Sequence, residues 1–495
     1  MERKGFDNKK YLEMQSSKIL ERIAMFDGKL YLEFGGKLFD DYHASRVLPG
    51  FEPDSKIKML SQLKDQAEIL IVINANDIEK NKQRSDLGIT YDLDVLRLID
   101  IFNAKDFYVG SVVLTRFTYQ PSAIAFQKRL EMRGVKVYRH YPIEGYPSEV
   151  EKVVSDAGYG KNEYVITTRP LVVVTAPGPG SGKMATCLSQ LYHENKRGKK
   201  AGYAKYETFP VWNLPLNHPV NTAYEAATAD LNDMNMIDPF HLEAYGQMAV
   251  NYNRDVEIFP VLSAMLQKVL GECPYKSPTD MGVNMAGYCI TDEQEVFRAC
   301  KQEVLRRYYA AQLEVRKGTC SKETISKIEV LMQKMRITIK DREVVAPALE
   351  KEKITGLPGC AIQLPDGKIV TGKTGNLMGA SAAALLNALK VLSGLDDEVF
   401  LLSPSVIEPI QKLKVEYMGS KNPRLHTDEI LLSLAVSAAT DDVAKKALEN
   451  LGGLKGSEFH SSVVLSHVDE KTLKKLGINV TCEAGRQSGV GAEKN

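Results

Sequence analysis

One segment of the chain runs Leu171-Val172-Val173-Val174-Thr175-Ala176-Pro177-Gly178-Pro179-Gly180-Ser181-Gly182-Lys183. Its apolar, β-branched first half, bounded by turn residues, is typical of a buried strand. The glycines that follow permit a tight turn, and residues 184–192 suit a helix. A strand, a glycine-rich turn and a helix in this order indicate one unit of an α/β sheet.

The same alternation of strand and helix patterns extends over residues 60–206. Helical patterns cover 93–102, 122–132 and 148–157, and another begins near Gly182. The remaining apolar runs predict five strands, at 69–73, 107–114, 135–138, 171–174 and 202–206. The sequence therefore predicts a doubly wound, mostly parallel α/β sheet with a P-loop-like turn.

Three domains are expected from the patterns along the chain. Residues 1–290 form the α/β domain, with a hairpin at 30–39 whose turn is Gly35-Gly36 and a loop-rich segment at 210–290. Residues 291–352 form a helical hairpin that begins with a capping box at Thr291. Residues 353–495 form a second α/β domain, with a hairpin over 361–371 and strands at 399–402, 462–465 and 478–481.

Composition excludes several classes of partner. The 495 residues include 64 Lys and Arg against 63 Asp and Glu, so no basic excess favours nucleic acid. No charged leader followed by an apolar segment is present, and no apolar run approaches the ~20 residues that span a bilayer. We expect a cytoplasmic protein with no membrane partner, reduced cysteines and no metal site; a homo-oligomer stays possible.

The glycine-rich turn is the main candidate for ligand binding. Backbone amides of Gly178, Gly180, Ser181 and Gly182 can face one point, where a helix amino terminus and Lys183 add positive charge. We expect a phosphate group there, from ATP or another nucleotide.

The turn departs from the strict phosphate-loop pattern at two positions. Pro177 replaces its first glycine, and Met184 replaces the hydroxyl that holds Mg²⁺. Thr186 is nearly one helical turn beyond Lys183 and is a substitute candidate. The sequence therefore leaves a requirement for Mg²⁺ open.

Three further polar residues are assigned to the site. Glu207 follows the strand at 202–206, where it could act as a general base or bind a ribose. Asn74 follows the first strand of the sheet and is a second binding candidate. Arg254 could stabilise a phosphoryl group in transfer, although an ion pair with Asp255 or Glu257 is the commoner role of such an arginine.

A second segment, Gly367–Thr374, matches the phosphate-loop pattern without a mismatch. Three of its variable residues are β-branched, and the turn Pro365-Asp366-Gly367 precedes them. The segment is therefore predicted to be the second arm of a hairpin. Lys373, Thr374 and Ser381 remain reserve candidates for an anion site.

The order of these features resembles uncharacterised protein family 0371, a bacterial family of similar length. The segments that carry the resemblance are Phe34-Gly35-Gly36-Lys37, the 175–183 turn, Asn217-His218-Pro219-Val220-Asn221 and the run from Thr371 to Ala384. The resemblance implies a multidomain α/β architecture whose C-terminal domain has a cytidine-deaminase-like topology. The zinc-deaminase signature is absent from this sequence, so that likeness concerns the fold alone.

Three functions stay open at this point. The first is a nucleotide-dependent enzyme that transfers a phosphoryl or nucleotidyl group to a small metabolite, with Lys183, Glu207 and Arg254 as catalytic residues. The second is a phosphate-ligand sensor or scaffold without catalysis. The third is a dinucleotide-dependent oxidoreductase with Glu207 on the ribose.

Overall fold

A computed structural model describes residues 4–36, 38–39, 41–84 and 87–485. The chain divides into an N-terminal unit that ends at Cys300 and a C-terminal unit that begins at Lys301. Each unit has its own sheet. None of the helices in the described ranges has the length and apolarity needed to cross a membrane.

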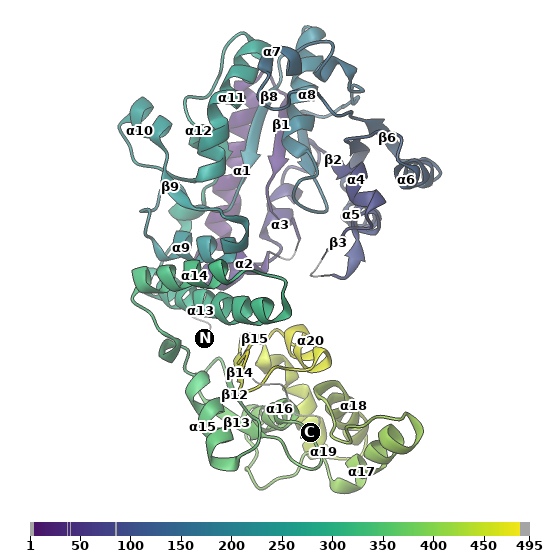
Figure 1. Cartoon of the computed structure of the whole chain (residues 1–495), viewed down its shortest axis with the longest axis vertical. Helices are drawn as coiled ribbons and strands as arrows, with labels where there is room; N and C mark the ends of the chain where they lie inside the picture. The colour runs from purple at the N-terminus through teal and green to yellow at the C-terminus, as the bar shows by residue number, and fades with distance from the viewer. Residues whose placement is uncertain (1–3, 37, 40, 85–86, 486–495) are drawn as a thin grey trace. The chain divides into compact units, whose positions relative to one another are not determined.

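The N-terminal unit contains a sheet of seven strands in the order β11-β8-β1-β7-β2-β5-β6, and every pair in it is parallel. These strands lie side by side in the upper part of Figure 1. Their bounds are β1 (Leu30–Phe34), β2 (Ala67–Asn74), β5 (Tyr108–Thr115), β6 (Lys136–Arg139), β7 (Leu171–Thr175), β8 (Gly202–Tyr206) and β11 (Gly282–Val283). The predicted parallel α/β sheet is confirmed.

Twelve α-helices of the described chain belong wholly to this unit. They are α1 (Asn8–Met25), α2 (Tyr42–Val47), α3 (Ser55–Ser61), α4 (Ala75–Glu79), α5 (Tyr91–Ala104), α6 (Pro121–Glu131), α7 (Val150–Val153), α8 (Lys183–Lys196), α9 (Pro219–Ala227), α10 (Pro239–Tyr245), α11 (Asn253–Leu270) and α12 (Pro278–Met281). Two short antiparallel pairs complete it: β3 (Gln83–Arg84) with β4 (Ile89–Thr90), and β9 (Asn235–Ile237) with β10 (Val250–Tyr252).

The predicted hairpin at residues 30–39 is wrong. Leu30–Phe34 is an interior strand, paired with β8 on one side and β7 on the other. All five of its residues are buried, and four of them are apolar, because helices cover both faces of the sheet at this strand. Lys37, in the expected second arm, lies outside the described residues.

The two faces of the sheet are covered by different helices. Tyr206 of β8 faces α1 and α3, because its hydroxyl contacts that of Tyr11 at 2.5 Å and its ring lies 5.8 Å from the Lys56 ammonium. On the opposite face, the Tyr31 hydroxyl of β1 donates to Glu194 of α8 at 2.8 Å. Helices on both faces explain why β2 is buried along its whole length.

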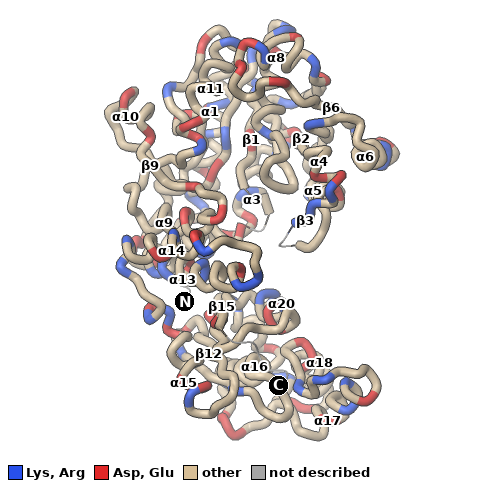
Figure 2. The backbone as a smooth tube through the Cα atoms, in the orientation of Figure 1, with Lys and Arg blue, Asp and Glu red and all other residues tan. Residues whose placement is uncertain are grey.

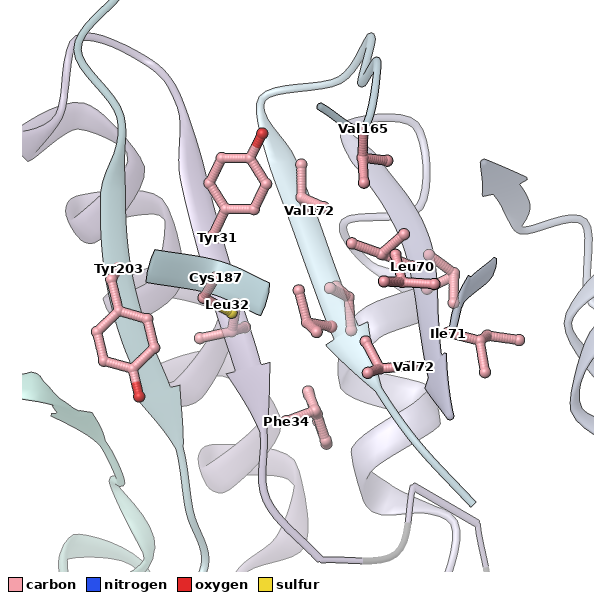
Figure 3. Packing of buried hydrophobic residues seen from close by; sticks show 14 of the residues in the cluster. Tyr31, Leu32, Phe34, Leu70, Ile71, Val72, Val165, Val172, Cys187 and Tyr203 are labelled. Carbon is pink, nitrogen blue, oxygen red and sulfur yellow. The ribbon is translucent and has the colours of Figure 1, made fainter. Parts of the chain in front are cut away.

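The core of this unit lies along the middle strands of the sheet. Figure 3 shows apolar side chains of β1, β7 and β2 packed together, with Cys187 of α8 crossing above β1. Leu32, Val172 and Val72 are all fully buried. This packing holds the carboxyl ends of the strands in fixed positions.

The long helix α11 was not expected from the sequence. It spans eighteen residues within the segment predicted to be rich in loops, and Pro260 lies inside it. A proline in a sequence normally indicates the end of a helix, because it lacks an amide donor and crowds the preceding turn. Here six apolar residues of the helix are buried, and that packing offsets the loss of one hydrogen bond.

The C-terminal unit holds a four-stranded mixed sheet in the order β13-β12-β14-β15. The strands are β12 (Gly359–Gln363), β13 (Ile369–Lys373), β14 (Glu458–Ser461) and β15 (Asn479–Cys482). The helices of this part of the chain are α13 (Glu293–Lys317), which begins before Lys301, α14 (Lys322–Met335), α15 (Val345–Thr355), α16 (Ala380–Leu392), α17 (Pro404–Lys412), α18 (Thr427–Ser437), α19 (Asp442–Glu449) and α20 (His467–Lys475).

Several expectations for this part of the chain can be compared with the structure. The β12–β13 pair is antiparallel, which confirms the second hairpin. The strand expected at 399–402 is absent, since those described residues are irregular or bent, and the strand expected at 462–465 lies four residues earlier. The first turn of α13 is capped by Asp292, whose carboxylate accepts from the amides of Gln294 and Glu295, and not by Thr291.

Candidate functional site

The carboxyl ends of five adjacent strands meet at one edge of the N-terminal sheet. Because β8, β1, β7, β2 and β5 are parallel and neighbouring, the residues at their ends form one row. In that order the row contains Glu207, Glu33, the 178–183 turn, Asn74 and Thr115.

At the centre of this row, the connections that follow β1 and β7 run over opposite faces of the sheet. After β1 the chain continues to α3, on the face of Tyr206; after β7 it continues to α8, on the face of Tyr31. Adjacent strands whose connections leave in opposite directions open a crevice at their carboxyl ends, and ligands of open α/β sheets bind there. The glycine-rich turn lies at this change of side, next to β1.

The carbonyl groups of the turn are bonded to protein donors. The Ser181 carbonyl accepts from the Thr115 hydroxyl at 2.6 Å, and the Gly180 carbonyl from the Asn74 amide at 3.4 Å. The Ser181 hydroxyl donates to the Gly178 carbonyl at 2.8 Å. Gly180 and Gly182 have φ values of 74° and 91°, which favour glycine. The turn is therefore held by the ends of β2 and β5.

The amides of the same segment are left without such partners. No described residue accepts a hydrogen bond from the backbone amides of residues 180–185, and the first amide of α8 with a partner is that of Thr186, bonded to Gly182. Carbonyls that are satisfied and amides that are not give the segment the polarity of an anion site.

Lys183 is the first residue of α8 and is partly exposed. Within the described ranges its ammonium group takes part in no ion pair. Burial raises the pKa of the Cys187 thiol one turn later; Glu33 adds to this rise and Lys183 opposes it. Both charges therefore act close to the first turns of α8, and Lys183 stays available for an anion.

Thr186 and Asn74 have different surroundings. Thr186 is fully buried, and its hydroxyl has no hydrogen-bond partner among the described residues. Asn74 caps α4 by accepting from the amide of Asn76 at 2.9 Å while its own amide contacts the turn. Asn74 thus supports the turn, whereas the side chain of Thr186 is buried and is not exposed to solvent.

Glu207 belongs to a buried network at the end of β8. Its carboxylate accepts from the Tyr252 hydroxyl at 2.6 Å and pairs with Lys205 at 2.6 Å, and Lys205 also pairs with Asp255. Burial raises the pKa of Glu207; Lys205 opposes the rise and Asp255 adds to it. Two carboxylates that share one ammonium group keep a proton more readily than an isolated glutamate.

Arg254 does not join this network directly. Its guanidinium pairs with the buried carboxylate of Asp233 at 2.6 Å. The Cζ atom of the guanidinium lies 5.8 Å from the centre of the Tyr252 ring. The sequence placed an ion pair closer along the chain, with Asp255 or Glu257. The actual partner is 21 residues away and adjacent only in the fold.

Glu33 is a site residue that the sequence reasoning missed. It is nine-tenths buried in β1, between the turn after β7 and the network after β8, and it accepts from the Tyr203 hydroxyl at 2.8 Å. A charged residue inside the apolar run Leu30–Phe34 was the available signal. The expected hairpin placed that run at an edge, where a charge carries no such meaning.

The parallel sheet of one unit and the mixed sheet of the other define a two-unit α/β protein. Two family models match it: the domain of unknown function DUF1846, N-terminal, over residues 4–336, and DUF1846, C-terminal, over residues 340–489. A UPF0371 protein of Streptococcus pyogenes serotype M5 (strain Manfredo) is 56% identical over 477 residues, which is 96% of this chain and 97% of the relative. Another, of Streptococcus thermophilus (strain ATCC BAA-491 / LMD-9), is 57% identical over 481 residues, 97% of each chain.

The chain therefore belongs to the UPF0371 family, which confirms the resemblance noted in its sequence. These relatives are bacterial proteins.

Proposed function

We propose that the protein binds a phosphate-bearing small molecule, a nucleotide in the first instance, at the turn between β7 and α8. The observation that supports this most is the polarity of the turn: the carbonyls of Gly178, Gly180 and Ser181 are bonded within the protein, whereas no described residue pairs with Lys183 or with the backbone amides of residues 180–185. A phosphate accepts several hydrogen bonds and carries charge opposite to that of Lys183.

Group transfer is the use of this site that we favour. Glu33 lies on β1, next to β7, and Glu207 follows β8, one strand further along the sheet. Burial raises the pKa of Glu207, and a carboxylate with a raised pKa suits a general base near neutral pH. The acceptor would be a small metabolite bound near Glu207. Arg254 would support Asp233 and the network around it, since its charge is already paired.

A phosphate-ligand sensor without catalysis is the second candidate. Met184 occupies the position of the usual Mg²⁺ ligand, and Lys205 already engages the Glu207 carboxylate. A sensor needs only the anion-binding turn at residues 178–185 and no catalytic base. A dinucleotide site is the third, with Glu207 on the ribose.

Calorimetric titration of ATP, with and without Mg²⁺, tests the proposal. We expect Lys183→Ala to weaken ATP binding at least tenfold, because it removes the ammonium group beside the turn at residues 178–185. Lys199→Ala, which removes an equal charge from the exposed end beyond α8, is the matched control and should bind as the unaltered protein does.

The titration also separates the candidates. Tightening by Mg²⁺ favours transfer, equal binding without the metal favours the sensor, and tighter binding of NAD than of ATP favours the dinucleotide site. Binding that is unaffected by Lys183→Ala would refute the proposed location.

A further inference from the structure

The C-terminal unit contains a cavity of about 380 Å³ beside β13. Residues of α15, β13, α16 and the loop 375–378 line it. β13 is an edge strand, since its partner within the described sheet is β12 alone. The lining includes two lysines, Lys351 and Lys373, and no aspartate or glutamate.

Four backbone carbonyls around this cavity, those of residues 371, 375, 376 and 377, accept hydrogen bonds from the protein. The Thr371 carbonyl accepts from the Asn387 amide at 2.9 Å. In the loop, the Gly375 carbonyl accepts from Arg424 at 2.8 Å and the Asn376 carbonyl from Gln411 at 2.9 Å. The carbonyl of the next residue, 377, accepts from the backbone of residue 425 at 3.0 Å. The loop is thereby fixed with its carbonyls engaged.

Four donors around the cavity have no partner among the described residues: two lysine ammonium groups and two backbone amides of the loop. Neither Lys351 nor Lys373 has a side-chain ion pair or hydrogen bond to any residue that the structure describes. The same holds for the backbone amides of Asn376 and Leu377. Two ammonium groups and two backbone amides without a described partner, beside engaged backbone carbonyls and no carboxylate, favour an anion over a cation.

The cavity also has an apolar part, formed by Leu377, Met378 and Ala383. Its floor at Gly372 is close-packed, because a Cβ atom there would stand 2.7 Å from the Ala380 carbonyl oxygen and would overlap the backbone of Ala384. A ligand that fits both parts has a charged end and a short aliphatic portion.

We propose that this cavity binds a small organic anion, a carboxylate or a phosphate ester with a short carbon chain, held by Lys351 and Lys373. The site is separate from the turn at residues 178–185 and does not depend on the function proposed for it. It would give the C-terminal unit a ligand of its own.

Calorimetric titration of the full chain carrying Lys183→Ala isolates this site from the other. Glycerol 3-phosphate and pentanoate are the two probes, and they distinguish a phosphate ester from a carboxylate. We expect at least one probe to bind with saturation, and Lys373→Ala and Lys351→Ala each to weaken that binding at least fivefold. Ala383→Met, which fills the apolar part, should abolish it.

The control is Lys368→Ala, which removes an equal charge from an exposed position in the turn of the same hairpin. It should leave binding unchanged. Lys373→Arg, which keeps the charge, should retain most of the affinity and shows that loss in Lys373→Ala is not loss of folding. The proposal is overturned if neither probe saturates, or if Lys368→Ala weakens binding as much as Lys373→Ala.

Discussion

The two glycine–lysine segments, 178–183 and 367–374, contain similar residues and have different structures. The first, which violates the phosphate-loop pattern twice, follows a central parallel strand and opens a fourteen-residue helix. The second, which satisfies the pattern, lies in an antiparallel hairpin, and its lysine is the last residue of an edge strand. The comparison teaches that the phosphate-loop pattern by itself does not specify a strand–turn–helix structure, because the better match forms a hairpin.

Glycine has a different task in each segment, and substitution can show it. We expect Gly372→Ala to destabilise the C-terminal unit by roughly 3 kcal/mol, because the new methyl group would overlap the backbone of α16. Gly182→Ala should cost about 1–2 kcal/mol, since its φ is positive and Thr115 lies 3.2 Å from the added atom. Denaturant unfolding measures both.

Gly375→Ala is the control for this pair, because nothing lies within 4 Å of its added Cβ. It should unfold as the unaltered protein does. If Gly182→Ala were instead the more damaging change, the turn would be a packing element first, and the contrast between the segments would fail.

Each unit also contains a histidine whose pKa is shifted, and the two shifts have opposite directions. The pH dependence of stability should therefore differ between the units. Burial lowers the pKa of His140 in the N-terminal unit to about 3, whereas the hydrogen bond to Asp469 raises the pKa of His426 in the C-terminal unit. A lowered pKa means that the unfolded chain takes up the proton first. Stability from His140 is therefore lost as pH falls below about 6.5.

From pH 7.5 to 5.5 that loss should be about 1.4 kcal/mol, and His140→Gln should remove it. His426 has the opposite sign: its contribution is present below the unfolded pKa and is lost as pH rises through the raised one. His426→Gln should therefore cost more stability at pH 5.5 than at 7.5. Hydrogen exchange of each unit at both values measures the differences; equal slopes for both variants would contradict the assignment.

The smallest effect concerns the bond that ties the first segment to β5. Thr115→Val removes the donor to the Ser181 carbonyl, and we expect a loss of about 1 kcal/mol in stability and a severalfold weaker affinity for ATP. Thr115→Ser keeps the hydroxyl and should restore both. Unfolding and titration of the two variants decide it; equal binding by Thr115→Val would show that the turn needs no such support.

The sequence determines the net charge of the protein, but it did not predict which charged residues pair with each other. Acidic and basic residues are interspersed along both units (Figure 2), as the near-zero net charge suggested. Their partners were a different matter. Arg254 pairs with Asp233 and Glu207 with Lys205 and Tyr252, and these contacts join β8, the loop before β9 and the start of α11.

Sequence alone determined five of the seven strands of the parallel sheet, the hairpin at β12 and β13, and the presence of a glycine-rich turn between a strand and a helix. These follow from periodicity and turn chemistry, which act between residues close in the chain. The position of β1, the burial of Glu33 and the cavity beside β13 were decided by the tertiary structure. Each depends on pairing between segments far apart in sequence, and no local pattern specifies which strands become neighbours.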